Sequence, residues 1–524
     1  MARIRSKNLF DLIKSLSKNE KRYFQVINNT SANPDDKKMI LLFDIINNQK
    51  EFDEEKILAK EKSIKPSQLS NLKAYLYKKV LEAIRQFNSE KILDIRIREQ
   101  IDFAQLLIDR RLFNQAEACL EKAKKMAISY QKYELQLEII KLEKSLLSET
   151  IDADNINKVD KLIAEVRSIN SIITNITLFS NLSIKLNSLY TKTGYIRDEN
   201  DYQKVKEFFN SNIPALNENN LSIAELLHLY RLYTGYYFFI QDFENGYSYA
   251  KKSVAIFQES TWLIKADPEA YIKALNHLLI SQYKLFKYPE FVDSNKILLA
   301  FSQENSLHLN ENIRIRLLKY FFIHEINKFF MTGDFEKGVE TMLVIKGEEI
   351  EGLMKVLDLH SSLILSYKIA CLHFGAGNFS QALRWLNKII NLQNVDIRED
   401  LHCFARIINL ICHFELGNYD VINHYIISTY RFLLKKDDLR SYQKYILGFL
   451  RNLKKDQEQE LSERFEKLKA QLTPLMGSPY EKRAFIYFDI ISWLQSKIEK
   501  RAVQDVIKSR LANSRLELPD RLKK

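Results

Sequence analysis

The sequence is poor in the two residues that most often interrupt regular secondary structure. It has 12 glycines and 8 prolines in 524 residues, which is less than half of the roughly 12% that average usage gives. A β-rich protein needs turn residues about every 8–12 positions, so this composition excludes that class. With 46% hydrophobic and 28% charged residues, the chain can still bury a large core. We therefore expect an all-α protein.

Cysteines and long apolar runs are also scarce. Four cysteines in a chain of 524 residues do not suggest a disulfide framework, so reduced thiols in a cytoplasmic protein are the plain interpretation. The N-terminal stretch is basic, but charges interrupt it too often for a signal-peptide core. No run approaches the ~18 apolar residues of a membrane span. These absences predict a cytoplasmic protein without a membrane span.

Positive charge is concentrated at the two ends of the sequence. Residues 1–100 contain 21 Lys and Arg against 14 Asp and Glu, and residues 500–524 contain 8 against 3. Residues 101–499 are balanced, with 50 of each sign. Because a local basic excess is the electrostatic signature of nucleic-acid binding, one functional hypothesis is that both ends bind nucleic acid around a neutral body.

The clearest internal repeat lies between Ser366 and Lys436. Its two copies read SYKIACLHFGAGNFSQALRWLNKII and RIINLICHFELGNYDVINHYIISTY. Each copy joins two helical apolar patterns through a Gly-Asn-aromatic turn, and Asn378 and Asn418 occupy the same place in the two copies. The repeat predicts two helical hairpins.

The signature of a turn followed by a second helix recurs along most of the chain. An aromatic residue stands three positions before each of seven marker residues: Ala116, Val205, Gly246, Phe291, Gly338, Ala382 and Ile422. Successive markers from Val205 on are 40 to 47 residues apart. The gap of 89 residues between Ala116 and Val205 leaves room for one more hairpin near residues 157–166. This spacing predicts about eight hairpins with a period near 44 over residues 92–437. Residues 1–91 then form an N-terminal helical module, and residues 438–524 form a C-terminal helical cap with a basic tail.

The order of large, small and aromatic residues in these units resembles the tetratricopeptide repeat family. Two units match its spacing: Tyr230, Tyr233, Thr234, Tyr237, Gly246 and Ala250 in one, and Phe103, Ala104, Leu107, Ala116 and Ala123 in the other. Small residues at these positions let two helices approach closely. The family period is about 34 residues, so each helix would be longer here by about one turn. The resemblance implies a right-handed α-solenoid capped by helices at both ends.

The same resemblance implies a binding groove, because the first helices of tetratricopeptide arrays line a concave surface that binds extended or helical peptides. When the inward positions of the family's first helices are transferred to this sequence, six residues are predicted to line the groove: His228, Arg231, Lys273, Asn276, Tyr320 and Asn327. It also predicts an apolar continuation of the groove at Tyr367, Phe374, Ile407 and Phe414. The alternative is that longer helices shift the register and place some of these residues in the core. Our first functional hypothesis is a non-enzymatic scaffold that binds a protein or peptide in this groove.

Residues 53–87 match the pattern of a helix-turn-helix. The apolar positions are Ala59, Ile64, Leu69 and Leu72. The outward positions of the second helix would be Lys65, Gln68, Asn71 and Lys73, whose side chains can hydrogen-bond base edges and phosphates. The first helix is acidic, which repels DNA, and the alternative is a helical cap with a solvated basic face. Because the arrangement resembles peptide-sensing regulators with an N-terminal helix-turn-helix, the second hypothesis is a ligand- or peptide-responsive transcription regulator.

No catalytic or cofactor motif is found in the sequence. His324-Glu325 lacks the second histidine of a zinc-protease motif, because Lys328 stands four positions after His324. The candidate metal ligands are Cys371, His373, His402, Cys403, Cys412 and His413. Free cysteines in an apolar helix usually pack as core residues, and His373 and His413 stand where the repeat has an aromatic residue. We therefore predict no metal, no cofactor and no enzymatic activity.

Overall fold

The computed structural model describes residues 6–29, 34–149, 155–305, 309–392, 396–452 and 458–516. Across these ranges every regular element is a helix, and there is no strand. The predicted all-α class is therefore confirmed. Among the described helices, none is long and apolar enough to cross a membrane. The predicted basic tail, at residues 517–524, lies outside the described residues.

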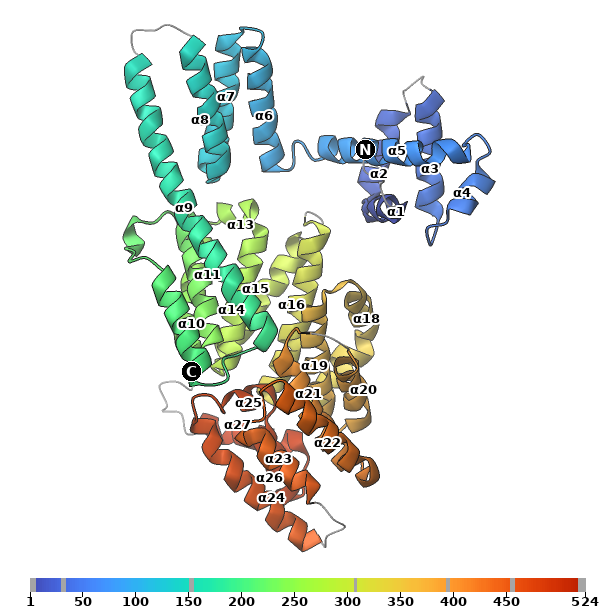
Figure 1. Cartoon of the computed structure of the whole chain (residues 1–524), viewed down its shortest axis with the longest axis vertical. Helices are drawn as coiled ribbons and strands as arrows, with labels where there is room; N and C mark the ends of the chain where they lie inside the picture. Colours follow the sequence, from blue (N-terminus) through green and yellow to red (C-terminus); the bar gives the residue numbers. More distant parts are fainter. Residues whose placement is uncertain are drawn as a thin grey trace. The chain divides into compact units, whose positions relative to one another are not determined.

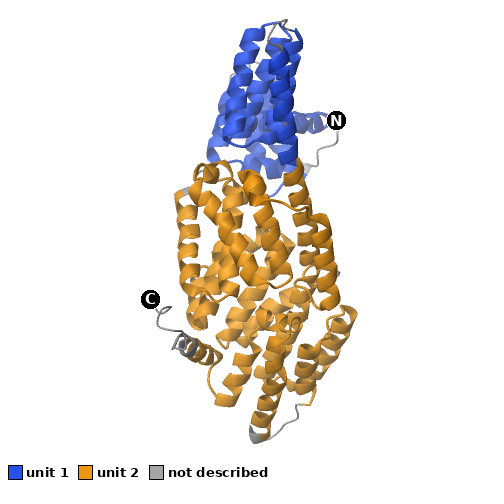
Figure 2. Cartoon of the chain, turned by 90° about the vertical axis from the view of Figure 1, so that its left-hand side faces the viewer, with its two compact units in different colours: residues 1–173 blue, residues 174–524 orange. Residues whose placement is uncertain are grey.

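The chain divides into two compact units, residues 1–173 and 174–524 (Figure 2). The division falls inside α9, a helix of 39 residues from Asn155 to Thr193. No glycine or proline interrupts this helix, so nothing in its sequence forces a turn. The extra unit predicted near residues 157–166 is therefore the first part of a helix that continues into the second unit without a turn.

Unit 1 begins with five helices around a core that contains Phe24, Phe43 and Leu76, each at most 1% exposed. Their bounds are α1 Ser6–Ser15, α2 Lys18–Asn28, α3 Pro34–Asn48, α4 Glu54–Lys60 and α5 Pro66–Phe87. Three further helices pack side by side in sequence order (Figure 1): α6 Leu93–Ile108, α7 Phe113–Ser129 and α8 Tyr133–Glu149. The first part of α9 completes the unit.

Unit 2 is a succession of helices that pack, for the most part, on their neighbours in sequence (Figure 1). Its longer helices are α10 Glu199–Asn212, α11 Ile223–Phe239, α12 Phe243–Glu259, α14 Pro268–Lys284, α15 Tyr288–Asn305, α16 Glu311–Thr332, α18 Gly347–Val356, α19 Leu359–Gly375, α20 Phe379–Ile390, α21 Glu399–Glu415, α22 Tyr419–Lys435, α23 Ser441–Arg451, α24 Glu458–Leu472, α26 Ile490–Glu499 and α27 Val503–Leu516. The short ones are α13 Trp262–Ala266, α17 Phe335–Val339 and α25 Arg483–Tyr487. Four helices that are not adjacent in sequence also contact one another in the order α14, α16, α19 and α21. We call these four the inner row.

The seven marker residues of the sequence pattern share one environment. Every one of them is buried in the first turns of a helix: Ala116 in α7, Val205 in α10, Gly246 in α12, Phe291 in α15, Gly338 in α17, Ala382 in α20 and Ile422 in α22. Burial of the same position in seven helices explains why the signature recurs, because a polar or badly fitting side chain there would face the neighbouring helix. The pattern therefore marks the packing face of these helices.

The turns of the duplicated segment depend on two glycines. Gly377 and Gly417 adopt left-handed backbone angles, with φ of 74° and 70°, which cost little only when there is no Cβ. The next residue in each turn donates its backbone N–H to the preceding helix. Asn378 bonds the carbonyl of His373 at 2.9 Å and Asn418 that of His413 at 3.0 Å. The two turns have the same backbone geometry, which explains the repeated Gly-Asn pair.

The C-terminal segment of unit 2 covers the last part of the predicted groove. The four side chains of the predicted apolar continuation are 1–6% exposed: Tyr367, Phe374, Ile407 and Phe414. The Phe374 ring centroid lies 4.8 Å from that of Phe488, and the Phe414 centroid lies 6.2 Å from that of Trp493. For Phe374, Ile407 and Phe414 the predicted continuation is therefore wrong as an open groove, because the chain buries these apolar side chains under its own C-terminal residues. Tyr367, by contrast, also lines a cavity.

Candidate binding cavities in unit 2

Two adjoining cavities lie in unit 2, each with a volume of about 360 Å³. Side chains from α9, α11 and α14 line the first cavity, and side chains from α14, α16 and α19 contribute most of the second. Six residues line both: Asn187, Tyr190, Tyr195, Asn276, His277 and Ile280. The shared residues make the two cavities neighbouring parts of one site, which we call the inner site.

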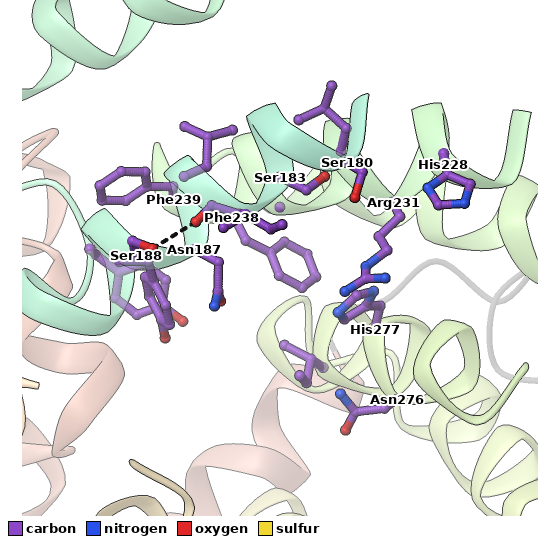
Figure 3. Close-up of a pocket in the computed structure, with 17 residues that line it drawn as sticks. Ser180, Ser183, Asn187, Ser188, His228, Arg231, Phe238, Phe239, Asn276 and His277 are labelled. Carbon is purple, nitrogen blue, oxygen red and sulfur yellow. Dashed lines mark hydrogen bonds between the residues drawn. The ribbon is translucent and has the colours of Figure 1, made fainter. Parts of the chain in front are cut away.

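The first cavity brings a cation and an imidazole together. Figure 3 shows Arg231 on α11 directed toward His277 on α14, with Ser180, Ser183 and Asn187 contributed by α9. Burial, followed by the nearby charge of Arg231, lowers the pKa of His277 to about 4. The imidazole is therefore neutral at pH 7, and Arg231 is the charged group of this cavity.

The structure brings five of the six predicted groove residues to the inner site. His228 and Arg231 line the first cavity, and Tyr320 and Asn327 line the second. Asn276 belongs to both. Lys273 lines neither, because its ammonium group pairs with the Glu269 carboxylate at 2.5 Å. Arg316 pairs with the same carboxylate.

A buried hydrogen-bond network fixes the two asparagines. His324 is fully buried, and its Nε2 lies 2.9 Å from Asn276 Oδ1 while its Nδ1 lies 3.4 Å from Asn327 Nδ2. Burial lowers the pKa of His324 to about 3, so the ring stays neutral and can donate to Asn276 while it accepts from Asn327. Lys368 donates to Asn327 Oδ1 at 2.5 Å. Both asparagines are thereby held in one orientation.

Four cations line the second cavity, and the sequence analysis selected none of them. They are Lys284, Lys319, Lys368 and Arg398. No Asp or Glu is among the residues that line either cavity. Burial, with the charges of Lys368 and Arg398, lowers the pKa of Lys284 well below its usual range. Burial also lowers the pKa of Lys368 to about 8. The second cavity therefore concentrates positive charge without a balancing carboxylate on its wall.

A carboxylate next to this wall, that of Asp400, is already occupied by Arg398. Arg398 donates two hydrogen bonds to Asp400, from Nε at 2.9 Å and from the terminal nitrogen at 2.7 Å, and the Tyr487 hydroxyl donates a third. Arg398 and Asp400 are 3% and 1% exposed. The Arg398 backbone N–H also donates to the Thr191 carbonyl at 2.7 Å. This buried pair thus joins the end of α9, the start of α21 and the end of α25.

The cysteines and histidines considered as metal ligands pack instead of clustering. In the described parts of the chain, no group of three or more His, Cys, Asp and Glu side chains is placed to hold a metal ion. Cys403 and Cys412 are fully buried in an apolar core. The His413 ring stacks on Tyr425 with centroids 4.8 Å apart, and the Asn418 amide lies 3.2 Å from its Nδ1.

The N-terminal module presents part of the predicted DNA-binding face. Lys65, Gln68 and Asn71 are exposed along one side of α5. Lys73 is not on this side: it is 8% exposed and forms an ion pair with Glu54. The apolar pattern also needs correction, because Ala59 is exposed and the fully buried core residue of α4 is Ile57.

No protein-family model matches this sequence, and a search of curated proteins finds none that is similar. The tetratricopeptide resemblance therefore remains an expectation for this chain. The scaffold hypothesis rests on the inner site, and the regulator hypothesis rests on the exposed side of α5.

Proposed function

We propose that this chain is a non-enzymatic cytoplasmic binding protein. Its hairpins form a tetratricopeptide-like, right-handed α-solenoid of about eight units, and its inner site binds a segment of a partner protein or peptide. One observation carries the proposal. Five side chains predicted from the repeat register, on the three successive first helices α11, α14 and α16, line two adjoining cavities.

The inner site has the properties that recognition of a polypeptide segment requires. Its cavities are large enough for side chains or a chain end, not for a folded domain, at about 360 Å³ each. Its polar groups stand on helices, and Asn276 and Asn327 are held in place by His324. Polar groups that are already oriented lose little entropy when a ligand binds, so they favour affinity and selectivity.

The proposal predicts that Arg231→Ala/Asn276→Ala loses the partner. Two hydrogen-bonding groups of the site disappear, and each is worth about 1–2 kcal/mol in binding, so we expect affinity to fall at least about tenfold. The measurement is capture of partners by the tagged full chain from a cell extract, followed by titration of the captured partner. Arg231→Ala alone is the variant with the lower risk to folding, since Arg231 is exposed.

Lys273→Ala is the matched control for this experiment. It also removes a polar side chain from α14, within one turn of Asn276, but Lys273 lines neither cavity. It should retain the partner. If the double variant and Lys273→Ala capture the same partners with equal affinity, the inner site is not where the partner binds.

A second candidate function, DNA binding by the N-terminal module, is favoured by the exposure of Lys65, Gln68 and Asn71 on one side of α5. These positions are three residues apart, so they follow one face of the helix over nearly two turns. Polar side chains on such a face can enter the major groove. In this case the chain would be a ligand-responsive regulator whose inner site receives the signal.

For this candidate we expect the full chain to bind duplex DNA with an affinity that falls steeply with salt. Lys65→Ala/Gln68→Ala/Asn71→Ala should abolish that binding, because it removes the three exposed polar groups among those predicted to reach the bases. Lys37→Ala, at an exposed position of α3, is the control and should bind as the wild type does. Fluorescence anisotropy of a labelled duplex at 50 mM and 200 mM salt measures both quantities. Absence of binding at the lower salt excludes the candidate.

A further inference from the structure

The second cavity holds more positive charge than the protein itself neutralises. Lys284 extends from the end of α14, Lys319 from α16 and Lys368 from α19, so three helices of the inner row each contribute one ammonium group. Lys284 Nζ lies 5.3 Å from the centroid of the Tyr283 ring, and Lys368 Nζ lies 5.2 Å from the same centroid. Two ammonium groups therefore lie close to the Tyr283 ring.

The hydrogen-bond partners of these lysines are neutral or absent. Lys319 donates to Ser361 Oγ at 3.1 Å and Lys368 donates to Asn327 Oδ1. Within the described residues, Lys284 Nζ has no hydrogen-bond or ion-pair partner. Each ammonium group carries three donors, so most of the donors that face this cavity have no protein acceptor.

Among the described residues, no carboxylate forms an ion pair with these three lysines. Burial lowers the pKa of Lys319, and the nearby charge of Asp358 opposes that effect. Asp358 accepts the backbone N–H of Ser361 at 2.9 Å and its hydroxyl at 2.6 Å, so it serves as the cap of α19. Asp400 is held by Arg398 and Tyr487. Lys284, Lys319 and Lys368 are half-buried, and a half-buried charge without a paired acid loses hydration and gains little in return. Such a cluster of cations in a cavity is a candidate functional site, and an anionic ligand would supply the counter-charge.

We propose that the second cavity binds an oxyanion with at least two negative charges, either a phosphate ester or a pair of carboxylates, held by Lys284, Lys319 and Lys368. The inference names the ligand group of the same inner site, so it rests on the proposed function. The tyrosine hydroxyls and asparagine amides of the cavity wall add neutral donors around the anion. The C-terminal residues Ile486 and Tyr487 close one side of the cavity, which suits the charged end of a ligand.

Repulsion among the lysines has a consequence for the empty protein. Burial first, and then the charges of Lys368 and Arg398, lower the pKa of Lys284 and so oppose its protonation. Removing one ammonium group while keeping the length of the side chain should therefore stabilise the unliganded fold, and it should weaken anion binding at the same time. A lysine with a purely structural role would show the opposite effect on stability.

The experiment measures thermal unfolding and titration calorimetry of the full chain with two probes, pyrophosphate and tricarballylate, at constant ionic strength. We expect a saturable rise in the unfolding temperature of the wild type with at least one probe. Lys284→Met and Lys368→Met should each weaken binding at least tenfold, and Lys284→Met should raise the unfolding temperature without a probe. Lys355→Met removes an exposed lysine of α18 that lines neither cavity and should change neither result.

The two probes separate the two sources of the anion. Binding of pyrophosphate alone identifies a phosphate ester, and binding of tricarballylate alone identifies carboxylates. Binding of both means that the site selects for charge. No saturable rise with either probe, equal binding by Lys284→Met and Lys355→Met, or a lower unfolding temperature for Lys284→Met without a probe would each overturn the inference.

Failure of this inference is distinguishable from failure of the proposed function. If the wild type captures a partner that Arg231→Ala/Asn276→Ala loses, but neither probe binds, the oxyanion site is wrong and the partner site stands. If a probe binds and Lys284→Met abolishes its binding while no partner depends on Arg231 or Asn276, the oxyanion site stands and the proposed function is wrong.

Discussion

Replacement of Asp400 by asparagine is expected to destabilise unit 2 by about 3–5 kcal/mol, the usual result of removing one member of a buried ion pair. The substitution keeps the size of the side chain but leaves the Arg398 guanidinium buried without a counter-charge. It also replaces an acceptor of the Tyr487 hydroxyl. All three tryptophans, at positions 262, 385 and 493, belong to unit 2, so tryptophan fluorescence during urea unfolding reports on this unit.

Two further variants test the cause of that loss. Asp437→Asn removes a carboxylate that is 87% exposed, and it should change the free energy of unfolding by less than about 0.5 kcal/mol. Arg398→Met/Asp400→Leu removes both charges together and should recover most of the loss, because an apolar pair avoids the cost of burying ions. If the double variant is as unstable as Asp400→Asn, packing and not charge accounts for the effect.

Acidification from pH 6.5 to pH 5 is expected to destabilise unit 2 by several kcal/mol. Burial is the main cause that lowers the pKa of four histidines, to about 3 for His324 and about 4 for His277, His360 and His373. An unfolded chain protonates its histidines near pH 6.5. Below that pH the unfolded state therefore binds more protons than the folded state, and stability falls as the pH falls.

The expected slope can be measured and assigned. Each histidine that stays neutral in the fold contributes about 1.4 kcal/mol per pH unit, so four give on the order of 5 kcal/mol per unit at most. The depressed pKa of Asp400 does not affect this range, because its contribution is lost only below about pH 4. Urea unfolding at several pH values between 7 and 5 provides the slope.

His373→Phe should reduce that slope by the share of one histidine. His373 is 7% exposed, its Nδ1 has no hydrogen-bond partner in the described structure, and its position in the repeat suits an aromatic ring. The variant should therefore be more stable than the wild type at pH 5. His424→Phe, at an exposed position of α22, is the matched control. A stability that does not change between pH 7 and pH 5 would contradict the neutral state of these histidines in the fold.

The features that were predictable from the sequence depend on residues close to one another in the chain. Gly377 and Asn378 form the predicted turn because the left-handed angle and the returning hydrogen bond involve one helix end only. The burial of Gly246 and Gly338 follows from the same local period. A wrongly assigned residue in one hairpin does not affect the assignment of the next hairpin. A degenerate signature therefore still locates the packing face.

Features that depend on distant residues could not be predicted in this way. The Tyr367 hydroxyl donates to the backbone carbonyl of Tyr487, 120 residues further along the chain, and no local pattern indicates that contact. For this reason, the sequence pattern did not predict that the C-terminal segment covers the apolar continuation of the groove. The continuity of α9 was missed because a break was inferred from the spacing of markers, although no residue within the helix requires one.

Two parts of the candidate sites were within reach of the sequence. Lys284 lies eight residues after Asn276, so it continues a face already selected as inner. Because lysines are mostly exposed in proteins, the pattern alone gave no reason to select it. Lys73 was placed outward although it follows the buried Leu69 by four residues, which puts both on one stripe of α5.

The return of the C-terminal segment determines how much of the inner row would be available to the proposed ligand. A hairpin array in general gains binding surface with every added unit, so its reach would follow the number of repeats. Here α19 and α21 give their apolar inner positions to residues 483–493 of the same chain. Under the proposed binding function, the length of the binding surface is thus set by the position at which the polypeptide doubles back. A change in the C-terminal segment alone would then lengthen or shorten the bound segment without altering a helical hairpin.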